Sequence, residues 1–173
     1  MNLEYRQYLP AGFSPGSRVW VYQSNRQFAI GEALKLEELL RGFAGGWLSH
    51  GEQVKAEARL FFGQFIILLA DESQTGVSGC STDSSVQFIK HIEKEFGVNL
   101  FDRLSLAFVI REKIQLLPLA QMDYALEHNF INAETLYFNN TVQTMEALEK
   151  NWIIPVQESW LAKKIIKPLY SGK

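Results

Sequence analysis

The sequence has one cysteine, Cys80, and only three histidines, His50, His91 and His128. One cysteine cannot form an internal disulfide, and this set of residues has none of the Cys/His spacings that bind zinc. We therefore expect no metal site and no cofactor. Glycine (12 residues) and proline (5) are also not abundant, and 47% of the chain is hydrophobic, which excludes disorder for the bulk of the protein.

The sequence also lacks an excess of positive charge and any long apolar run. Lys and Arg total 17 against 19 Asp and Glu, a net charge of −2, which argues against nucleic acid and anionic membrane surfaces as partners. The longest apolar run is Phe65–Ala70, far short of the roughly 20 residues of a membrane span. The start Met1–Arg6 is polar and has no signal-peptide core. We expect a cytoplasmic protein with no nucleic-acid partner and no membrane span.

The hydrophobic periodicity predicts alternating strands and helices in the first two thirds of the chain. Their order is strand, helix, strand, strand, helix, strand, strand, over residues 18–22, 30–43, 55–62, 65–70, 84–96, 104–110 and 114–118. The short breaks at 63–64 and 111–113 predict two hairpins, 55–62 with 65–70 and 104–110 with 114–118. The run Phe65–Ala70 is apolar at every position, so it needs cover on both faces and belongs in the middle of a sheet. The first six elements match the ferredoxin-like β-α-β-β-α-β plait, an α+β fold, and residues 114–118 add an extra strand.

Residues 119–173 form a C-terminal extension in this scheme. We expect helices near 120–128 and 141–150, a short strand at 135–138 and a last amphipathic piece at 159–167. If this extension packs on the other face of the sheet, it covers Trp20, Tyr22 and Val109. No linker separates it from the core at about 18–118, so the sequence predicts a single domain over residues 1–173.

The most unusual local sequence is Ser78–Ser85, a run of small polar residues that leads directly into the helix expected at 84–96. A helix start offers free backbone N–H groups and a positive dipole, which can hold an anion through Ser81 and Asp83 or make Cys80 nucleophilic. The alternative is structural: Ser81, Thr82 or Asp83 caps the helix, and Cys80 is a small buried apolar residue.

His50 is the residue best placed to act with Cys80. In the plait, the loop of residues 47–51 and the connection of residues 71–82 lie at the same end of the sheet, so His50 could approach Cys80. A Cys–His pair is the minimum for thiol catalysis, with the imidazole taking the proton. The alternative is that His50 is a loop side chain that satisfies nearby carbonyls or caps the helix end at Gly45-Gly46.

The opposite end of the expected sheet holds Asn25 and Arg26 after the first strand and Arg103 before the fourth. Two arginines and an amide could bind a carboxylate or phosphate. The alternative is that Arg26 pairs with Asp102 and that Asn25 makes an Asx-turn into the first helix.

Several of these segments together resemble a family of short, uncharacterised bacterial proteins that are often labelled ABC-transporter ATPases. The segments that carry the resemblance are Val19–Arg26, Trp47 with His50-Gly51, Ser78–Ser85 and Phe138–Asn140. The resemblance implies a shared fold and shared site positions but no established activity. The label itself requires a Walker A loop, G-x-x-x-x-G-K-[ST], and the chain has none, since its only Gly-Lys pair is Gly172-Lys173.

The sequence therefore favours a cytoplasmic binding or protein-interaction module that is not an ATP hydrolase. Its partner would be an unidentified small molecule or protein, and a homodimer is compatible with this reading. The alternative function is a thiol-dependent enzyme or redox-responsive site built on Cys80 and His50.

Overall fold

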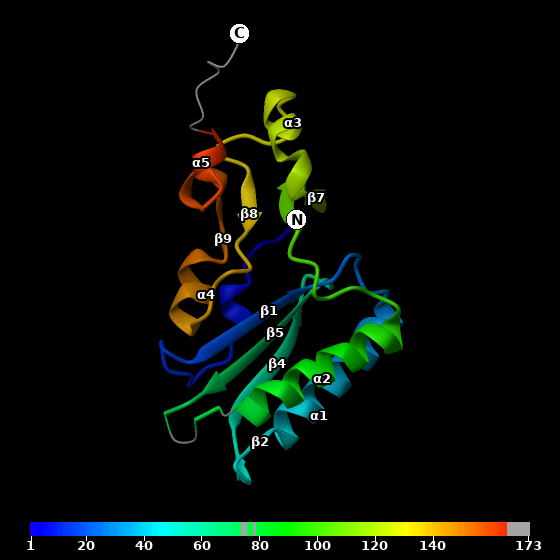
Figure 1. The fold of residues 1–173 in the computed structure, drawn as a ribbon, viewed down its shortest axis with the longest axis vertical. Coiled ribbons are helices and arrows are strands. Elements are labelled where there is room, and N and C mark those ends of the chain that lie inside the picture. Colours follow the sequence, from blue (N-terminus) through cyan, green and yellow to red (C-terminus); the bar gives the residue numbers. More distant parts are fainter. Residues whose placement is uncertain (74–75, 78, 166–173) are drawn as a thin grey trace. The chain divides into compact units, whose positions relative to one another are not determined.

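The structure is a computed structural model that describes residues 1–73, 76–77 and 79–165, without the side chain of Cys80. It has an α+β fold with antiparallel sheets (Figure 1). The strands are β1 Arg18–Gln23, β2 Leu48–Ser49, β3 Glu52–Gln53, β4 Lys55–Phe61, β5 Phe65–Asp71, β6 Ser105–Ile110, β7 Lys113–Pro118, β8 Leu136–Phe138 and β9 Ile153–Pro155. The α-helices are α1 Ile30–Gly46, α2 Gly79–Phe96, α3 Met122–Glu127, α4 Met145–Asn151 and α5 Ala162–Ile165, and the 3-10 helices are η1 Arg6–Tyr8, η2 Leu119–Gln121 and η3 Val156–Glu158.

The chain divides into two compact units. We call residues Glu4–Asp102 and Asn140–Glu149 the N-terminal unit, and Met1–Leu3, Arg103–Asn139 and Lys150–Lys173 the C-terminal unit. The chain passes between them after Leu3, Asp102, Asn139 and Glu149, so neither unit is one continuous segment. The expectation of a single domain over residues 1–173 stays a prediction.

The N-terminal unit is built on a sheet with the strand order β1-β5-β4. Strands β4 and β5 form the predicted hairpin, with Phe61 opposite Phe65. The central position expected for Phe65–Ala70 is confirmed, and every residue of β5 is buried. An apolar strand of this kind is stable only where both of its faces are covered and both of its edges are paired.

Helices α1 and α2 lie side by side on one face of this sheet (Figure 1). The register places Trp20 and Ala58 opposite Leu68, so that these three side chains share a face. Tyr22 and Leu68 pack in one buried cluster with residues of both helices, such as Leu36 and Ile89. The expectation that Trp20 and Tyr22 face away from the helices is therefore wrong, because alternation in β1 places Val19 and Val21 on that other face.

Segments distant in sequence hold the edges of the sheet in the N-terminal unit. The backbone N–H of Val19 donates to the Gln143 carbonyl over 3.0 Å, and Arg18 forms a β-bridge with Thr144. At the β4 edge, the Arg59 guanidinium donates to the Tyr8 carbonyl over 2.5 Å. The N-terminal segment is fixed in turn by the Tyr5 hydroxyl, which donates to the Leu148 carbonyl over 2.8 Å.

The C-terminal unit contains a second sheet, with the strand order β7-β6-β8-β9. The hairpin of β6 with the extra strand β7 is confirmed. The order β1-β5-β4 is the one the plait predicts for its first three strands, but the strand expected as the fourth, β6, pairs with β7 and β8 in this second sheet. The ferredoxin-like plait is therefore not evident in the strand order. Residues 143–145 bind the start of the β1 edge, which is where a fourth plait strand would pair.

The buried core of the C-terminal unit gathers side chains from its sheet and its short helices. Its members are Leu106, Phe108, Met122, Ala125, Ile131, Tyr137, Val156 and Leu161. Helix α3 and strand β8 lie where the sequence predicted a helix and a strand, whereas α4 begins at Met145 and not at Thr141. Of the last expected amphipathic piece, Ala162–Ile165 is helical, and residues 166–167 lie outside the described residues.

No helix in the described ranges combines the length and the apolar composition that a membrane crossing would need.

Candidate functional site

The two loops expected at one end of the sheet do lie together. The Trp47 indole Nε1–H donates to the Ser81 carbonyl over 3.0 Å, and the Ser81 hydroxyl donates to the Leu48 carbonyl over 3.1 Å. A third bond runs from the Ser49 hydroxyl to the Gly76 carbonyl over 2.6 Å. These hydrogen bonds join the segment after α1 to the connection after β5 and to the start of α2.

Helix α2 begins earlier than the sequence pattern predicts, at Gly79 and not at Ser84. Ser81 and Ser85 are buried on its inner side, one helical turn apart, in line with Ile89. Serine is a polar residue, but it can be buried in a helix when its hydroxyl donates to a backbone carbonyl. The Ser85 hydroxyl donates to the Thr82 carbonyl over 2.7 Å. Ser81, Thr82 and Asp83 therefore lie inside α2 and do not cap a helix that starts at Ser84.

Among the described residues at this end of the sheet, the polar groups of Ser81 hold the segments together. Ser81 is 2% exposed, and both its hydroxyl and its carbonyl are used in the contacts with Trp47 and Leu48. Asp83 is exposed on the first turns of α2. Ser78 and the Cys80 side chain lie outside the described residues, so an anion site or a reactive thiol here stays a prediction.

His50 occupies the turn between β2 and β3. Its φ is 52° and that of Gly51 is 83°, the left-handed pair that closes a two-residue hairpin loop. The imidazole is exposed. The alternative role of capping the end of α1 falls to Gln53, whose side-chain amide donates to the Ala44 and Trp47 carbonyls over 3.4 and 3.3 Å.

At the opposite end of the sheet, Asn25 contacts the segment that follows α2, through Asn99. The Asn25 backbone N–H donates to the Asn99 carbonyl over 3.2 Å, and the Asn99 N–H donates to Oδ1 of Asn25 over 2.8 Å. The Asn25 side chain thus fastens the segment after α2 and does not form the expected Asx-turn into α1. The turn itself is supported by Ser24, whose hydroxyl accepts the Arg26 N–H over 3.3 Å.

Arg26 is bound within the N-terminal unit by a carboxylate and a backbone carbonyl. Its guanidinium donates to both carboxylate oxygens of Glu32, over 2.7 and 2.9 Å, and to the Phe96 carbonyl over 2.7 Å. The expectation that Arg26 pairs with Asp102 is therefore wrong, because Glu32 in the first turn of α1 presents a carboxylate that it can grip bidentately. Glu32 in turn accepts the Ala29 N–H over 2.8 Å, which satisfies a free donor at the helix start.

Arg103 lies in the C-terminal unit, whereas Asn25 and Arg26 lie in the N-terminal unit. A joint anion site of these three residues stays a prediction. Arg26 alone is ill suited to that role, because its donors are already directed at Glu32 and Phe96.

The Arg26–Glu32 pair gives a testable dependence of stability on pH. The hydrogen bond from Arg26, with the one from Ala29, lowers the pKa of Glu32 to about 2, and the same pair raises the pKa of Arg26. A carboxylate with a lowered pKa stabilises the folded state above its ordinary pKa near 4.5, and this contribution is lost as the pH falls toward 2. We expect the free energy of unfolding of Glu32→Gln to fall less steeply than that of the wild type between pH 5 and 2, the range that ends at the lowered pKa of about 2.

Urea denaturation at several pH values measures this effect. Glu38→Gln, at an exposed position of the same helix, is the matched control and should leave the slope unchanged. Equal slopes for the wild type and Glu32→Gln would show that the pair has no role in acid stability.

One cluster of side chains has no counterpart in the sequence-based predictions. Tyr124 and His128 stack with ring centroids 3.9 Å apart and planes 25° apart. Phe130 lies 6.3 Å from Tyr124 and 6.5 Å from His128, again with nearly parallel planes. We call these three residues the aromatic ladder. Tyr124 is 58% exposed and Phe130 56%.

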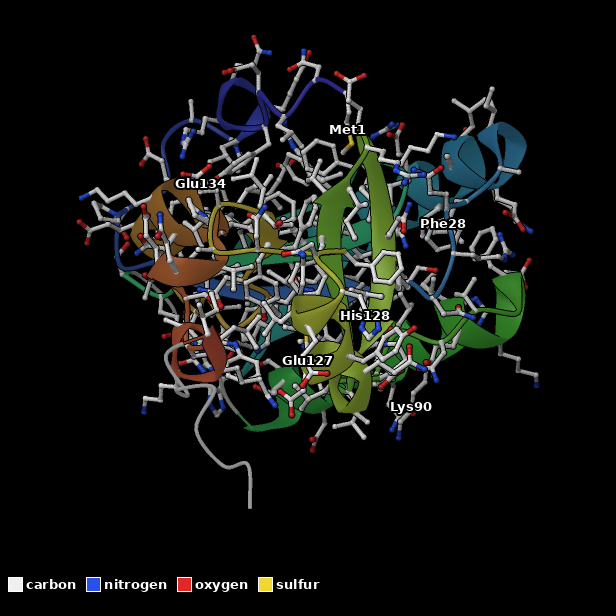
Figure 2. The ribbon with its side chains drawn as sticks, turned by 90° about the horizontal axis from the view of Figure 1, so that it is seen from above. Met1, Phe28, Lys90, Glu127, His128 and Glu134 are labelled. Atoms are coloured by element: carbon white, nitrogen blue, oxygen red, sulfur yellow. The ribbon has the colours of Figure 1, made fainter. Side chains whose placement is uncertain are left out.

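The end of α3 fixes the position of this ladder. Asn129 has a φ of 55°, its N–H donates to the Leu126 carbonyl over 3.2 Å, and the Phe130 N–H donates to the Ala125 carbonyl over 2.9 Å. These two bonds form a Schellman motif, which turns the chain back over its own helix. Tyr124 and His128 are four residues apart and share one side of α3, so the motif brings Phe130 beside them. Figure 2 shows His128 next to Glu127 at this end of α3.

Within the described ranges, no group of three or more His, Cys, Asp or Glu side chains is arranged to hold a metal ion. Comparison with known protein families finds no matching family model. No curated protein matches the chain. No solved structure matches it either.

Proposed function

We propose that the protein is a non-catalytic binding module that contacts a protein partner through the aromatic ladder. The observation that carries the proposal is the exposure of three stacked rings, Tyr124, His128 and Phe130, on a short helix with a fixed end. Exposed rings in contact with one another leave apolar area in water, and gathered apolar surface of this kind is typical of interaction sites. Aromatic residues are also enriched at the centres of protein interfaces.

The engagement of the polar candidate residues supports the same proposal. Ser81, Arg26 and Asn25 use their side chains to join segments of the N-terminal unit. Side chains held this way contribute to stability, and a catalytic role would require them to exchange these partners for a substrate. The sequence has no Walker A loop to hold a nucleotide triphosphate, so the proposed module is not an ATP hydrolase.

A thiol-dependent site on Cys80 and His50 is the second candidate. It is favoured by the hydrogen bonds that join residues 47–49 to residues 76–81, because they hold the loop that carries His50 close to the start of α2. A cysteine at a helix start near an imidazole would have a lowered thiol pKa.

Alkylation of Cys80 with iodoacetamide separates the two candidates. For a binding module we expect a rate at neutral pH no faster than that of free cysteine, whose pKa is about 8.5, and no change with His50→Ala. His91→Ala, at an exposed position of α2, is the matched control. A fast reaction that His50→Ala slows and His91→Ala does not would overturn the binding-module proposal in favour of the thiol site.

A further inference from the structure

The aromatic ladder offers ring faces to a ligand from solvent. The face of an aromatic ring carries negative charge density, and it attracts a cation placed within about 6 Å of the ring centre. Tyr124 and Phe130 are each more than half exposed, so their rings are accessible to such a group.

The chain segment that carries the ladder contains acidic residues and no basic side chain other than His128. From Ile114 to Asn139 the chain contains Asp123, Glu127 and Glu134 and no lysine or arginine. Asp123 and Glu127 flank Tyr124 on α3. Asp123 already binds one cation, Lys164 of α5, whose ammonium lies 3.1 Å from its carboxylate. Glu127 is exposed and has no ion pair within the described residues.

The N-terminal unit shows how this chain combines a ring and a carboxylate. The Arg18 guanidinium lies 4.8 Å from the centre of the Trp20 ring and forms an ion pair with Glu72 at 3.1 Å. The Arg26 guanidinium lies 5.9 Å from the Phe28 ring centre and pairs with Glu32. In both places an arginine joins an aromatic face to a carboxylate.

The aromatic ladder combines exposed rings with the nearby carboxylate of Glu127, but no arginine of this segment of the chain joins them. No cation lies over Tyr124, His128 or Phe130 in the part of the chain that the structure describes. Guanidinium suits such a place better than ammonium, because it is planar, stacks on rings and can grip a carboxylate with two N–H groups.

We propose that the aromatic ladder binds an arginine side chain from a basic segment of a partner protein, with the guanidinium stacked on the rings and paired with Glu127. This inference rests on the proposed function, because it names the chemistry of the partner that the module contacts. Charge complementarity selects the partner: a basic segment meets the acidic stretch Ile114–Asn139, whereas an acidic segment or a nucleic acid would be repelled.

The direct test is a titration of the full-length protein into a fluorescent peptide of alternating arginine and glycine, followed by anisotropy. We expect saturable binding below about 1 mM peptide, the range of a single weak docking contact. A peptide with citrulline in place of arginine has the same shape without the charge, and we expect it to bind at least about tenfold more weakly. Equal binding of the two peptides would overturn the proposal.

Ring substitutions locate the binding site. We expect Tyr124→Ala and Phe130→Ala each to weaken binding about two- to fivefold, the effect of one exposed cation–ring contact. Tyr8→Ala is the matched control, since Tyr8 is also 58% exposed and lies in the N-terminal unit. Tyr124→Leu keeps an apolar side chain of similar reach and serves if the alanine variant does not fold. Binding that none of the ladder variants changes, or that Tyr8→Ala weakens equally, would contradict the proposal.

Removal of Lys164, which forms an ion pair with Asp123, is expected to strengthen peptide binding. Lys164→Ala releases the Asp123 carboxylate beside Tyr124, so we expect the arginine peptide to bind about two- to fivefold more tightly. Lys163→Ala removes the same charge from the adjacent, exposed position and controls for general electrostatics. Equal tightening by both variants would indicate non-specific attraction and would overturn the assigned site.

The outcomes for the two proposals are distinguishable. Absence of peptide binding together with a slow, His50-independent reaction of Cys80 would remove the arginine ligand and leave the binding module in place. Fast, His50-dependent alkylation would overturn the module whatever the peptide does. A second copy of this chain as the occupant would appear as a concentration-dependent dimer that Tyr124→Ala dissociates and the arginine peptide does not affect, which would also overturn the proposal.

Discussion

Trp47→Ala is expected to destabilise the protein by about 3–5 kcal/mol, the range for loss of a large buried aromatic side chain. Trp47 is 2% exposed and follows the end of α1. Its ring contacts Trp20 at a centroid distance of 5.7 Å and Phe43 at 5.1 Å, so its removal leaves a cavity between the helices and the sheet. Urea denaturation followed by circular dichroism measures the change.

Trp47→Phe separates the packing contribution from the hydrogen bond of the indole. It keeps a ring in the cavity but leaves the Ser81 carbonyl without the donor at 3.0 Å, and we expect a loss of about 1–3 kcal/mol. If the alanine variant lost no more stability than the phenylalanine variant, the ring would not be a part of the core. Because Trp47 binds the carbonyl of Ser81, a buried residue in the first turn of α2, we also expect faster hydrogen exchange at the start of α2 in Trp47→Ala.

Local sequence patterns were sufficient to place the elements with strong periodicity. Phe65–Ala70 was predicted to be central because an apolar residue at every position can be satisfied only with cover on both faces, and β5 is the middle strand. The hairpins β4–β5 and β6–β7 follow from the short breaks between consecutive strand-like runs.

Pairings between distant segments could not be predicted in this way. Strand β6 was expected beside β1, but residues 143–145 bind the start of the β1 edge and β6 pairs with β8. Both arrangements satisfy the hydrogen bonds of β6, so its own sequence does not discriminate between them. The start of α2 was missed for a different reason. Ser81 and Ser85 can be buried because their hydroxyls donate hydrogen bonds to backbone carbonyls, and a hydropathy pattern counts them as polar.

The candidate sites show the same division. Residues 47–49 and the start of α2 lie together as expected, because the order of β1, β5 and β4 decides which of their loops are neighbours, whereas a joint site with Arg103 stays a prediction. The partner of Arg26 could not be predicted, because the pairing with Asp102 depended on the assumed plait, whereas Glu32 in the first turn of α1 accepts the guanidinium with both carboxylate oxygens. The aromatic ladder had a local signal that was missed: Tyr124 and His128 four residues apart, followed by Asn129 at a position that ends helices.

Cooperativity between the two units gives the other large expected effect. Leu68 in β5 and Trp152 before β9 are both 0% exposed, one in each unit. We expect Leu68→Ala to cost about 2–5 kcal/mol and Trp152→Ala about 3–5 kcal/mol. If residues 1–173 are a single domain, each variant shifts one common unfolding transition, and Trp152→Ala accelerates hydrogen exchange in β5 as much as in β8.

The course of the chain favours the single transition. Because the chain passes between the units after Leu3, Asp102, Asn139 and Glu149, unfolding of the C-terminal unit releases both ends of Asn140–Glu149, the segment whose residues 143–145 bind β1. Trp160→Ala is the control in the same unit, since Trp160 is 45% exposed and its loss should leave exchange in β5 unchanged. Rapid exchange in β8 with full protection of β5 in Trp152→Ala would show two independently unfolding units, and the single-domain prediction would then be wrong.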